Sequence, residues 1–328
     1  ETVFGAGSGT IAGGAGTNYL TVTAAGVGTS NLIFSTGSSD SVFAGAGATT
    51  VLSSGSNTQI TGDTGSLFVA GEASAETVFG STASNTTAFS AQNGEYFLGS
   101  ASGTSSLFID GGGSSQGGAS TVVAGAGALT VFGGAGAYPN QGLIFGGSGA
   151  LTFVANSGAS TVVGGVAQET LFGGSGSYIY LTGGAPAASA MFVAGGGNET
   201  LNGSSALVGN QLFAGMNTAG LGSNDSLIGG TGNDTIVGGT GQATMTGGGG
   251  NDFFVFNQAA GGGTNTITDF SNNDLLGVFG YGLTARAVVG ASSVSGGNTT
   301  ISLPDHTKIT LLGFTNLTTN DVLASPLG

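Results

Sequence analysis

The stretch that decides the fold is residues 220–256, which reads GLGSNDSLI, GGTGNDTIV, GGTGQATMT and GGGGNDFFV, followed by one phenylalanine. The four segments are nine residues long and align as Gly-Gly-x-Gly-x-Asp-x-U-x, where U is a large apolar residue. The sixth position is a carboxylate at Asp225, Asp234 and Asp252, and Ala243 replaces it in the third segment. A fixed period of this kind indicates a repetitive architecture in which each repeat forms one small structural unit.

Each nine-residue unit combines a glycine-rich turn with a short strand. Glycine permits the positive φ that a tight turn needs, and in the three residues after the turn only U points inward. Two units make one circuit of a coil, so equivalent positions recur every eighteen residues, as at Asp234 and Asp252. The sequence therefore predicts an all-β fold, a parallel β-roll or β-solenoid of nonapeptide repeats.

The nonapeptide resembles the calcium-binding repeat of the RTX (repeats-in-toxin) family, whose members fold as a parallel β-roll. Calcium takes about six to eight oxygen ligands, which carboxylates and backbone carbonyls supply. The resemblance implies Ca²⁺ as the cofactor, with these candidate ligands in the repeats: Asp225, Gly230, Gly232, Asp234, Gly248, Gly250 and Asp252. Asp234 and Asp252 should flank one calcium ion, whereas Asp225 is opposite Ala243 and should form a weaker site. The alternative is that these aspartates only shape Asx-turns.

Residues 1–219 carry a degenerate version of the same repeat. Apolar triplets such as TVF at residues 130–132 recur with many spacings of nine, and the turns keep their glycines. The sixth position is acidic only at scattered units, among them Asp40, Glu76 and Glu169. We interpret Glu76 and Glu169 as solvated turn carboxylates, and we expect strand ladders and stacked U residues to hold this degenerate solenoid together.

Position nine is often phenylalanine in the degenerate repeats. A strand that buries U points positions seven and nine outwards, so stacked units would align these rings in apolar stripes: Phe4, Phe34, Phe43, Phe79, Phe132, Phe145 and Phe172. Soluble monomers rarely expose a long apolar stripe, and few charges here oppose association. We predict that the protein associates with itself, as a homo-oligomer or polymer, through these stripes and the solenoid ends. The alternative is that the rings lie flat over the glycine turns of their own coil.

Residues 257–328 break the period and are predicted to be a C-terminal capping and secretion region. Their segment NTITDFSNNDLL, residues 265–276, is similar to the segment that closes RTX rolls in secreted proteases and surface-layer proteins. The similarity makes Asp269 and Asp274 candidate calcium ligands, with turn capping as the alternative, although Asn265 stands where the family usually has Asp.

Two strand-like runs in the same region, residues 299–303 and 308–312, flank a Pro-Asp-His turn and predict a hairpin. Such a tail can form a β cap over the open end of a solenoid, which otherwise exposes unpaired backbone groups.

The composition limits the possible partners. Of 328 residues, 70 are glycine and only two are basic, Arg286 and Lys308, against sixteen acidic residues, giving a net charge of −14. This charge excludes nucleic acid as a natural partner and favours divalent cations. No apolar run approaches the length of a membrane span, so membrane insertion is not expected, and no cysteine is present to form a disulfide. The first residues enter the repeat at its sixth position without a signal peptide, so we expect a fragment or processed piece.

No constellation of residues for catalysis is visible, and we expect no enzyme activity. The only histidine, His306, falls in the predicted hairpin turn, and there is no cysteine nucleophile, zinc-protease motif or Gly-x-Ser-x-Gly elbow. Together with the RTX resemblance, this predicts a calcium-dependent structural protein, exported by type I secretion, that forms a surface layer, filament or matrix outside a Gram-negative bacterium. The alternatives are the C-terminal export module of a larger secreted protease or lipase, and an adhesin.

Overall fold

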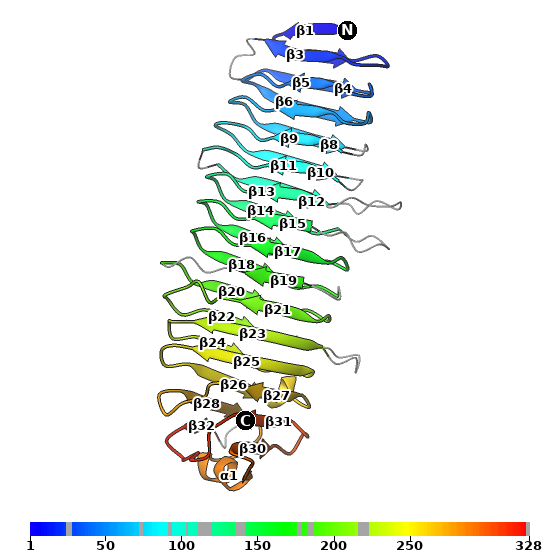
Figure 1. The fold of residues 1–328 in the computed structure, drawn as a ribbon. Helices are drawn as coiled ribbons and strands as arrows, with labels where there is room; N and C mark the ends of the chain where they lie inside the picture. The colour runs from blue at the N-terminus through cyan, green and yellow to red at the C-terminus, as the bar shows by residue number, and fades with distance from the viewer. Residues whose placement is uncertain are drawn as a thin grey trace. The chain divides into compact units, whose positions relative to one another are not determined.

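In the computed structural model the regular secondary structure is almost entirely β-strand (Figure 1). It describes residues 1–23, 28–71, 75–90, 94–102, 104–110, 120–134, 142–175, 179–182, 187–215 and 223–325. Two compact units are present, Glu1–Ala167 and Gln168–Gly328, and their boundary falls inside the predicted 1–219 solenoid. Each unit is a β-solenoid of parallel sheets, which confirms the predicted fold class.

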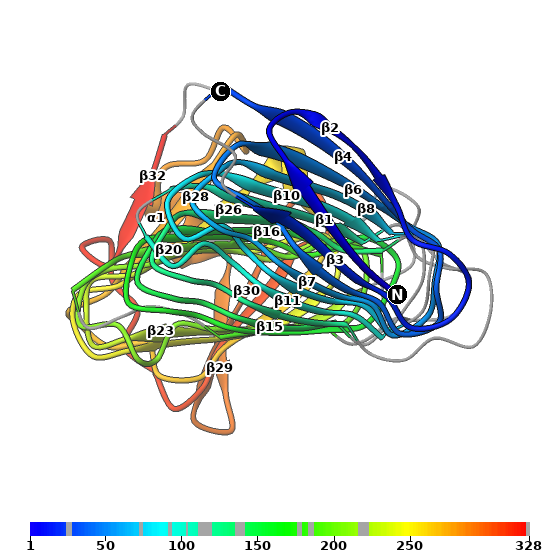
Figure 2. The same cartoon turned by 90° about the horizontal axis from the view of Figure 1, so that it is seen from above.

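In the first unit the chain alternates between two parallel sheets. The odd-numbered strands, in spatial order, are β1 (Thr2–Ala6), β3 (Tyr19–Thr23), β5 (Ser41–Phe43), β7 (Gln59–Thr61), β9 (Thr77–Phe79), β11 (Tyr96–Leu98), β13 (Thr121–Val123), β15 (Gly142–Phe145) and β17 (Ser160–Val163). The even-numbered strands are β2 (Gly9–Ala12), β4 (Ser30–Ser35), β6 (Ala48–Ser53), β8 (Leu67–Gly71), β10 (Thr86–Ser90), β12 (Ser106–Asp110), β14 (Leu129–Phe132) and β16 (Leu151–Val154). Seen from above, β2, β4, β6 and β8 lie in one layer, and β1, β3 and β7 lie in the layer that faces it (Figure 2).

The second unit has the same alternation. One sheet contains β18 (Glu169–Phe172), β20 (Ala190–Val193), β22 (Gln211–Phe213), β24 (Thr235–Val237), β26 (Phe253–Asn257), β28 (Leu275–Phe279) and β32 (Val322–Ala324). The other contains β19 (Ile179–Thr182), β21 (Glu199–Asn202), β23 (Asn224–Gly230), β25 (Gln242–Gly248), β27 (Thr264–Ile267) and β31 (Lys308–Leu311). The coil therefore continues beyond the point where the sequence period breaks.

The C-terminal end of the second unit is an antiparallel cap. Strand β30 (Asn298–Ser302) pairs antiparallel with β31 and with β29 (Ser292–Ser295), which confirms the predicted hairpin. The short helices are η1 (Gln258–Ala260) and α1 (Ala285–Gly290). No helix in the described part of the chain is long and apolar enough to cross a membrane.

The core is a stack of U residues between the two sheets. In the nonapeptide region Leu227, Ile236, Met245 and Phe254 are all 0% exposed. The register pairs Leu227 with Met245 and Ile236 with Phe254, residues eighteen apart, which confirms two nonapeptides per circuit. Because burying one such side chain contributes about 1.5–3 kcal/mol, these stacked residues are the main source of stability in a chain so rich in glycine.

Candidate functional site

The side chain at the sixth position of the repeat points into the coil, at the corner where a turn enters a strand. Asp40 shows why aspartate suits this place: its Oδ1 accepts the Asn18 backbone N–H from the preceding coil at 2.9 Å. Its Oδ2 accepts the N–H of Gly37, in its own turn, at 3.0 Å. A position-six aspartate therefore joins two neighbouring coils through backbone donors, which agrees with the strong preference of ionised carboxylates for N–H groups.

Three of the predicted calcium ligands stack in one such corner of the second unit. Asp234 accepts the N–H groups of Asn210 (2.6 Å) and Gly230 (2.7 Å). Asp252 Oδ1 accepts the Asp234 N–H at 2.8 Å, and Asp274 Oδ1 accepts the Asp252 N–H at 2.9 Å. The structure thus brings Asp234, Asp252 and Asp274 onto successive coils, as the eighteen-residue spacing of the first two predicts.

Asp269 joins this corner from the turn that follows β27. Its two carboxylate oxygens accept the N–H groups of Gly247 (3.0 Å) and Gly248 (2.8 Å), which belong to the turn that carries Asp252. The four aspartates form an acidic corner, which we define as Asp234, Asp252, Asp269 and Asp274.

The predicted turn glycines bring their backbones close together at the same corner. The Gly230 carbonyl accepts the Gly249 N–H at 2.8 Å. A Cβ at Gly248 would lie 2.0 Å from the Gly230 oxygen, and one at Gly250 would lie 2.4 Å from the Gly232 oxygen. Gly248 and Gly250 also have φ of +98° and +113°, so only glycine fits. The carbonyl oxygens of Gly230 and Gly232 therefore face the backbone of the next turn.

The acidic corner is electrostatically strained. Burial raises the pKa of Asp252 to about 7; the Asp234 N–H opposes this rise, and the carboxylates of Asp234, Asp274 and Asp269 add to it. Burial also raises the pKa of Asp234. An all-oxygen donor set with excess negative charge fits a hard divalent cation such as Ca²⁺. No three carboxylate or histidine side chains in the described residues converge on one point, so carbonyl oxygens would have to complete the ligand set.

Asp225 lies in a different corner, in the column formed by the odd-numbered strands. Its Oδ1 accepts the Glu199 N–H (3.3 Å), and its Oδ2 accepts the Gly215 N–H (2.8 Å) and the Ser223 hydroxyl (3.1 Å). The register places it beside Ala243, as expected. Burial raises the pKa of Glu199 to about 8; the N–H groups of Gly195 and Gly174 oppose this rise, and the Asp225 carboxylate adds to it. Glu199, which the sequence analysis missed, could have been found from its sixth position before Thr200.

The interpretation of Glu76 and Glu169 as solvated carboxylates is wrong, because they are only 3% and 1% exposed. Positions six and eight lie on the same face of a strand, so a position-six side chain enters the coil whatever its charge. Burial raises the pKa of Glu76 to about 7, with the Ser53 hydroxyl opposing the rise. The sequence analysis also missed Glu95, which is buried at position six of the next coil on the same side.

Position nine points outwards in the first unit, as predicted. On the odd-numbered strands the register aligns one outer column: Phe4, Thr21, Phe43, Thr61, Phe79, Leu98, Val123, Phe145 and Val163. On the even-numbered strands it aligns a second: Ala12, Phe34, Leu52, Ala70, Phe89, Ile109, Phe132 and Val154. We call these the two outer columns, and neither contains a charged residue.

The rings of the outer columns are open to solvent to different degrees. Phe4 is 69% exposed and Phe43 42%, whereas Phe34 and Phe79 are half-buried. Phe89 contacts the Phe68 ring of the next strand, with centroids 5.5 Å apart. The stripes are therefore real surface features that also cover part of the sheet beneath them.

The second unit has an apolar hollow of its own. Phe172, at position nine of β18, lines a hollow of about 490 Å³ together with Met191, Val193 and Phe213. The hollow has no charged lining residue. It therefore offers apolar contact area and no group suited to acid–base chemistry.

His306 lies exposed in the turn between β30 and β31, as predicted, with φ of +70°. Its nearest acidic neighbour in the chain, Asp305, accepts the Tyr281 hydroxyl at 2.9 Å and the Thr307 N–H at 3.0 Å.

No protein-family model matches this chain, and no curated protein matches it at a significant level.

Proposed function

We propose that this protein is an extracellular structural protein, a calcium-stabilised β-solenoid that associates with copies of itself into a layer, filament or matrix. The observation that carries the proposal is the pair of outer columns on the first unit, which run along both sheets without a charged residue. A regular stripe of this kind matches the same stripe on another copy, because both have the same spacing between strands.

The charge distribution argues against an acidic partner for the first unit. The first unit has no lysine, arginine or histidine side chain, so it offers nothing to attract an acidic polymer or an anionic surface. Association of the outer columns would instead bury phenylalanine, and each Å² of apolar surface removed from water contributes about 25 cal/mol. A long stripe makes many such contacts at once.

Calcium would act at the acidic corner. Asp234, Asp252, Asp269 and Asp274, with the carbonyls of Gly230 and Gly232, are the groups that would hold it, and its charge would offset their mutual repulsion. The RTX resemblance adds export by type I secretion to the surface of a Gram-negative bacterium. In the calcium-poor cell interior these turns would stay loose, and they would order after export, where calcium is plentiful.

Assembly can be tested with a matched pair of variants on strand β5. Phe43→Lys places a charge in an outer column, and Ser41→Lys places the same charge on the same strand outside it. Sedimentation velocity and negative-stain microscopy with calcium should show large assemblies for the wild type and for Ser41→Lys, and smaller ones for Phe43→Lys. Monodisperse monomers of the wild type, with calcium and with a chelator, would refute the proposal.

A further inference from the structure

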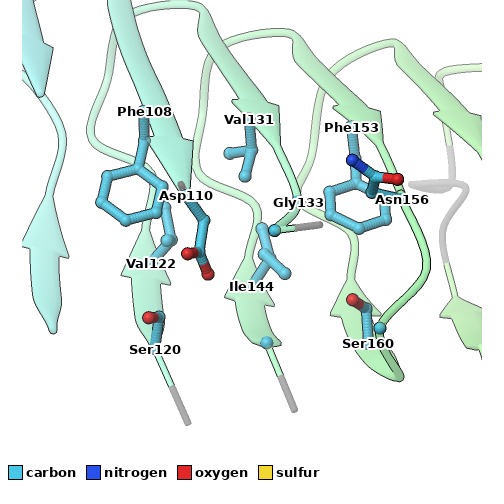
Figure 3. Close-up of a pocket in the computed structure, with 13 residues that line it drawn as sticks. Phe108, Asp110, Ser120, Val122, Val131, Gly133, Ile144, Phe153, Asn156 and Ser160 are labelled. Atoms are coloured by element: carbon cyan, nitrogen blue, oxygen red, sulfur yellow. The ribbon is translucent and has the colours of Figure 1, made fainter. Parts of the chain in front are cut away.

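Two cavities inside the first unit are too small for an organic ligand. One, of about 10 Å³, lies beside Phe108 and Val122, and the Asp110 carboxylate points into it (Figure 3). The other has the same volume and is lined by residues that include Phe97 and Tyr96. A volume of this size holds about one water molecule. The outer faces of the sheets therefore offer a ligand more surface than these cavities do.

The outer column of the odd-numbered strands alternates between a ring and a hydroxyl group over its first five strands. The register places Phe4, Thr21, Phe43, Thr61 and Phe79 at successive positions of this column. We call these five residues the alternating row. Neighbouring strands are about 4.8 Å apart, so the phenylalanines recur at about 9.6 Å. The outer column of the even-numbered strands differs, because it consists of aliphatic residues and phenylalanine alone.

A line of polar side chains runs beside the alternating row. Residues two apart on a strand share a face, so position seven stands next to position nine. Four strands thereby place a ring next to a hydroxyl-bearing side chain: Phe4 beside Thr2, Thr21 beside Tyr19, Phe43 beside Ser41, and Phe79 beside Thr77. Strand β7 adds the amide of Gln59. Tyr96 extends the aromatic surface past Phe79, with ring centroids 6.4 Å apart.

The residues of this face are uncharged, although the chain has a net charge of −14. Three acidic side chains of the first unit, Asp40, Glu76 and Glu95, are buried in the coil. An acidic polymer would be repelled by the overall charge of the chain. The complementary partner is therefore neutral, and it combines flat apolar faces for the rings with hydroxyl groups for the polar side chains.

A linear β-1,4-linked glucan has this chemistry. The hydroxyl groups of its glucose rings are equatorial, so the two faces of each ring are apolar C–H surfaces and the edges are polar. Aromatic side chains provide flat apolar area for such a face, and hydroxyl and amide side chains can donate to and accept from the edges. Each sugar advances the extended chain by about one strand spacing, and every second sugar has the same orientation. Equivalent sugar faces therefore recur at the interval of the phenylalanines.

We propose that the alternating row binds a single chain of neutral β-1,4-linked glucan, which runs across strands β1 to β9. Phe4, Phe43 and Phe79 stack against every second sugar, and the Thr21 and Thr61 hydroxyls form hydrogen bonds with the sugars between them. The row extends over four strand spacings, so it accommodates about five sugars. This partner goes beyond self-association, for which the outer column of the even-numbered strands remains available.

Isothermal titration calorimetry of the full chain with cellohexaose tests the proposal. Cellohexaose is long enough to reach all three phenylalanines and should bind more tightly than cellotriose, which reaches at most two. Maltohexaose contains the same sugar in α-1,4 linkage, which coils the chain, and it should not bind. Absence of cellohexaose binding to the folded wild type, or equal binding of maltohexaose, would overturn the proposal.

A matched pair of variants locates the binding surface. Phe43→Ala removes the central ring of the row and should weaken cellohexaose binding roughly tenfold. Phe89→Ala removes a ring of similar exposure, 38% against 42%, from the other outer column, and should bind cellohexaose as the wild type does. Equal weakening in the two variants would overturn the assignment to the alternating row.

Thr61→Val separates sugar binding from association between copies. The variant keeps the shape of the side chain and removes its hydroxyl, so it should weaken cellohexaose binding and leave the assemblies seen in sedimentation velocity intact. Cellohexaose binding as tight as in the wild type would contradict the role of Thr61. Wild-type assemblies that bind no cellohexaose would overturn this proposal alone, whereas a monodisperse wild type that binds it would overturn self-association alone.

Discussion

Replacing Glu95 with glutamine should reduce a stability loss that the first unit suffers as the pH rises in calcium-free buffer, and should leave the part that Glu76 causes. Burial raises the pKa of Glu95 to about 8 and that of Glu76 to about 7, from an ordinary value of 4.5. A carboxyl whose pKa is higher in the folded than in the unfolded state favours folding at low pH, where it is protonated in both. That advantage is lost as the pH rises from about 4.5 to about 8.

The size of this stability loss follows from the pKa values of Glu76 and Glu95. A tenfold change in acidity corresponds to about 1.4 kcal/mol, so a rise from 4.5 to about 8 at Glu95 makes its ionisation cost on the order of 5 kcal/mol of folding free energy. The value for Glu76 is on the order of 3 kcal/mol. The two overlap, because Glu76 is one cause of the raised pKa of Glu95. We therefore expect the two glutamates together to lower the free energy of unfolding of the first unit by roughly 5 kcal/mol between pH 5 and 9.

Hydrogen exchange gives the stability of the first unit separately from that of the second. Amides of β9, β11 and β13 in the wild type, with EDTA, should exchange roughly several thousandfold faster at pH 9 than at pH 5 after correction for intrinsic rates. Glu95→Gln should make this dependence shallower, because the carboxamide stays neutral, and Glu76 should account for the part that remains. Thr58→Val removes an unpartnered hydroxyl from the same column without changing charge, and should keep the wild-type dependence. Equal corrected exchange at both pH values in the wild type, or a Glu95→Gln profile as steep as the wild type, would refute the reasoning.

Three further outcomes are expected. Phe153→Ala, at a fully buried side chain, should cost about 3–5 kcal/mol in urea unfolding, while Phe132→Ala on the outer face should cost less than about 1 kcal/mol. Gly71→Ala should destabilise the first unit because its methyl group meets the Glu76 carboxylate, and Glu76→Ala in the same chain should recover part of the loss, as a double-mutant cycle would measure. Asp234→Ala and Asp252→Ala should weaken calcium binding in calorimetry and delay calcium-dependent folding of residues 220–328 followed by circular dichroism; Asp63→Ala, at an exposed aspartate of the first unit, should do neither.

The period and the position of U made most of the fold predictable. The repeat places one large apolar residue on each short strand, so only one face of each strand can be buried. The apolar residues of successive strands must therefore stack between the sheets, as found for Leu227, Ile236, Met245 and Phe254. The same alternation places Phe4 and Phe43 outside, as found. Continuation of the coil through β27, β28, β31 and β32 was not visible in the sequence, because loops of unequal length separate these strands.

The candidate site was only partly predictable. Spacing alone placed Asp252 beside Asp234, and it placed Asp225 beside Ala243. The inward direction of position six also follows from alternation, yet charge led us to assign Glu76 and Glu169 to solvent. The charge of a position-six side chain does not predict its exposure, because the turn has the same geometry whatever residue occupies the corner. The role of Asp269 depends on a longer turn, whose path the period does not determine.

Aspartate and glutamate divide the corners into two kinds. Asp40, Asp225, Asp234 and Asp274 have both carboxylate oxygens bonded. Three glutamates at the equivalent position, Glu76, Glu95 and Glu199, each leave at least one buried oxygen without a partner. Backbone N–H groups in a parallel ladder sit at fixed places, so one extra methylene is enough to carry a carboxylate past them. The backbone and neighbouring side chains therefore donate to both oxygens of these four aspartates, whereas Glu76, Glu95 and Glu199 each keep a buried oxygen that a proton or a cation from outside would neutralise. Because the chain has only two basic residues, we expect the stability of these glutamate corners to depend on pH and on the cations in solution.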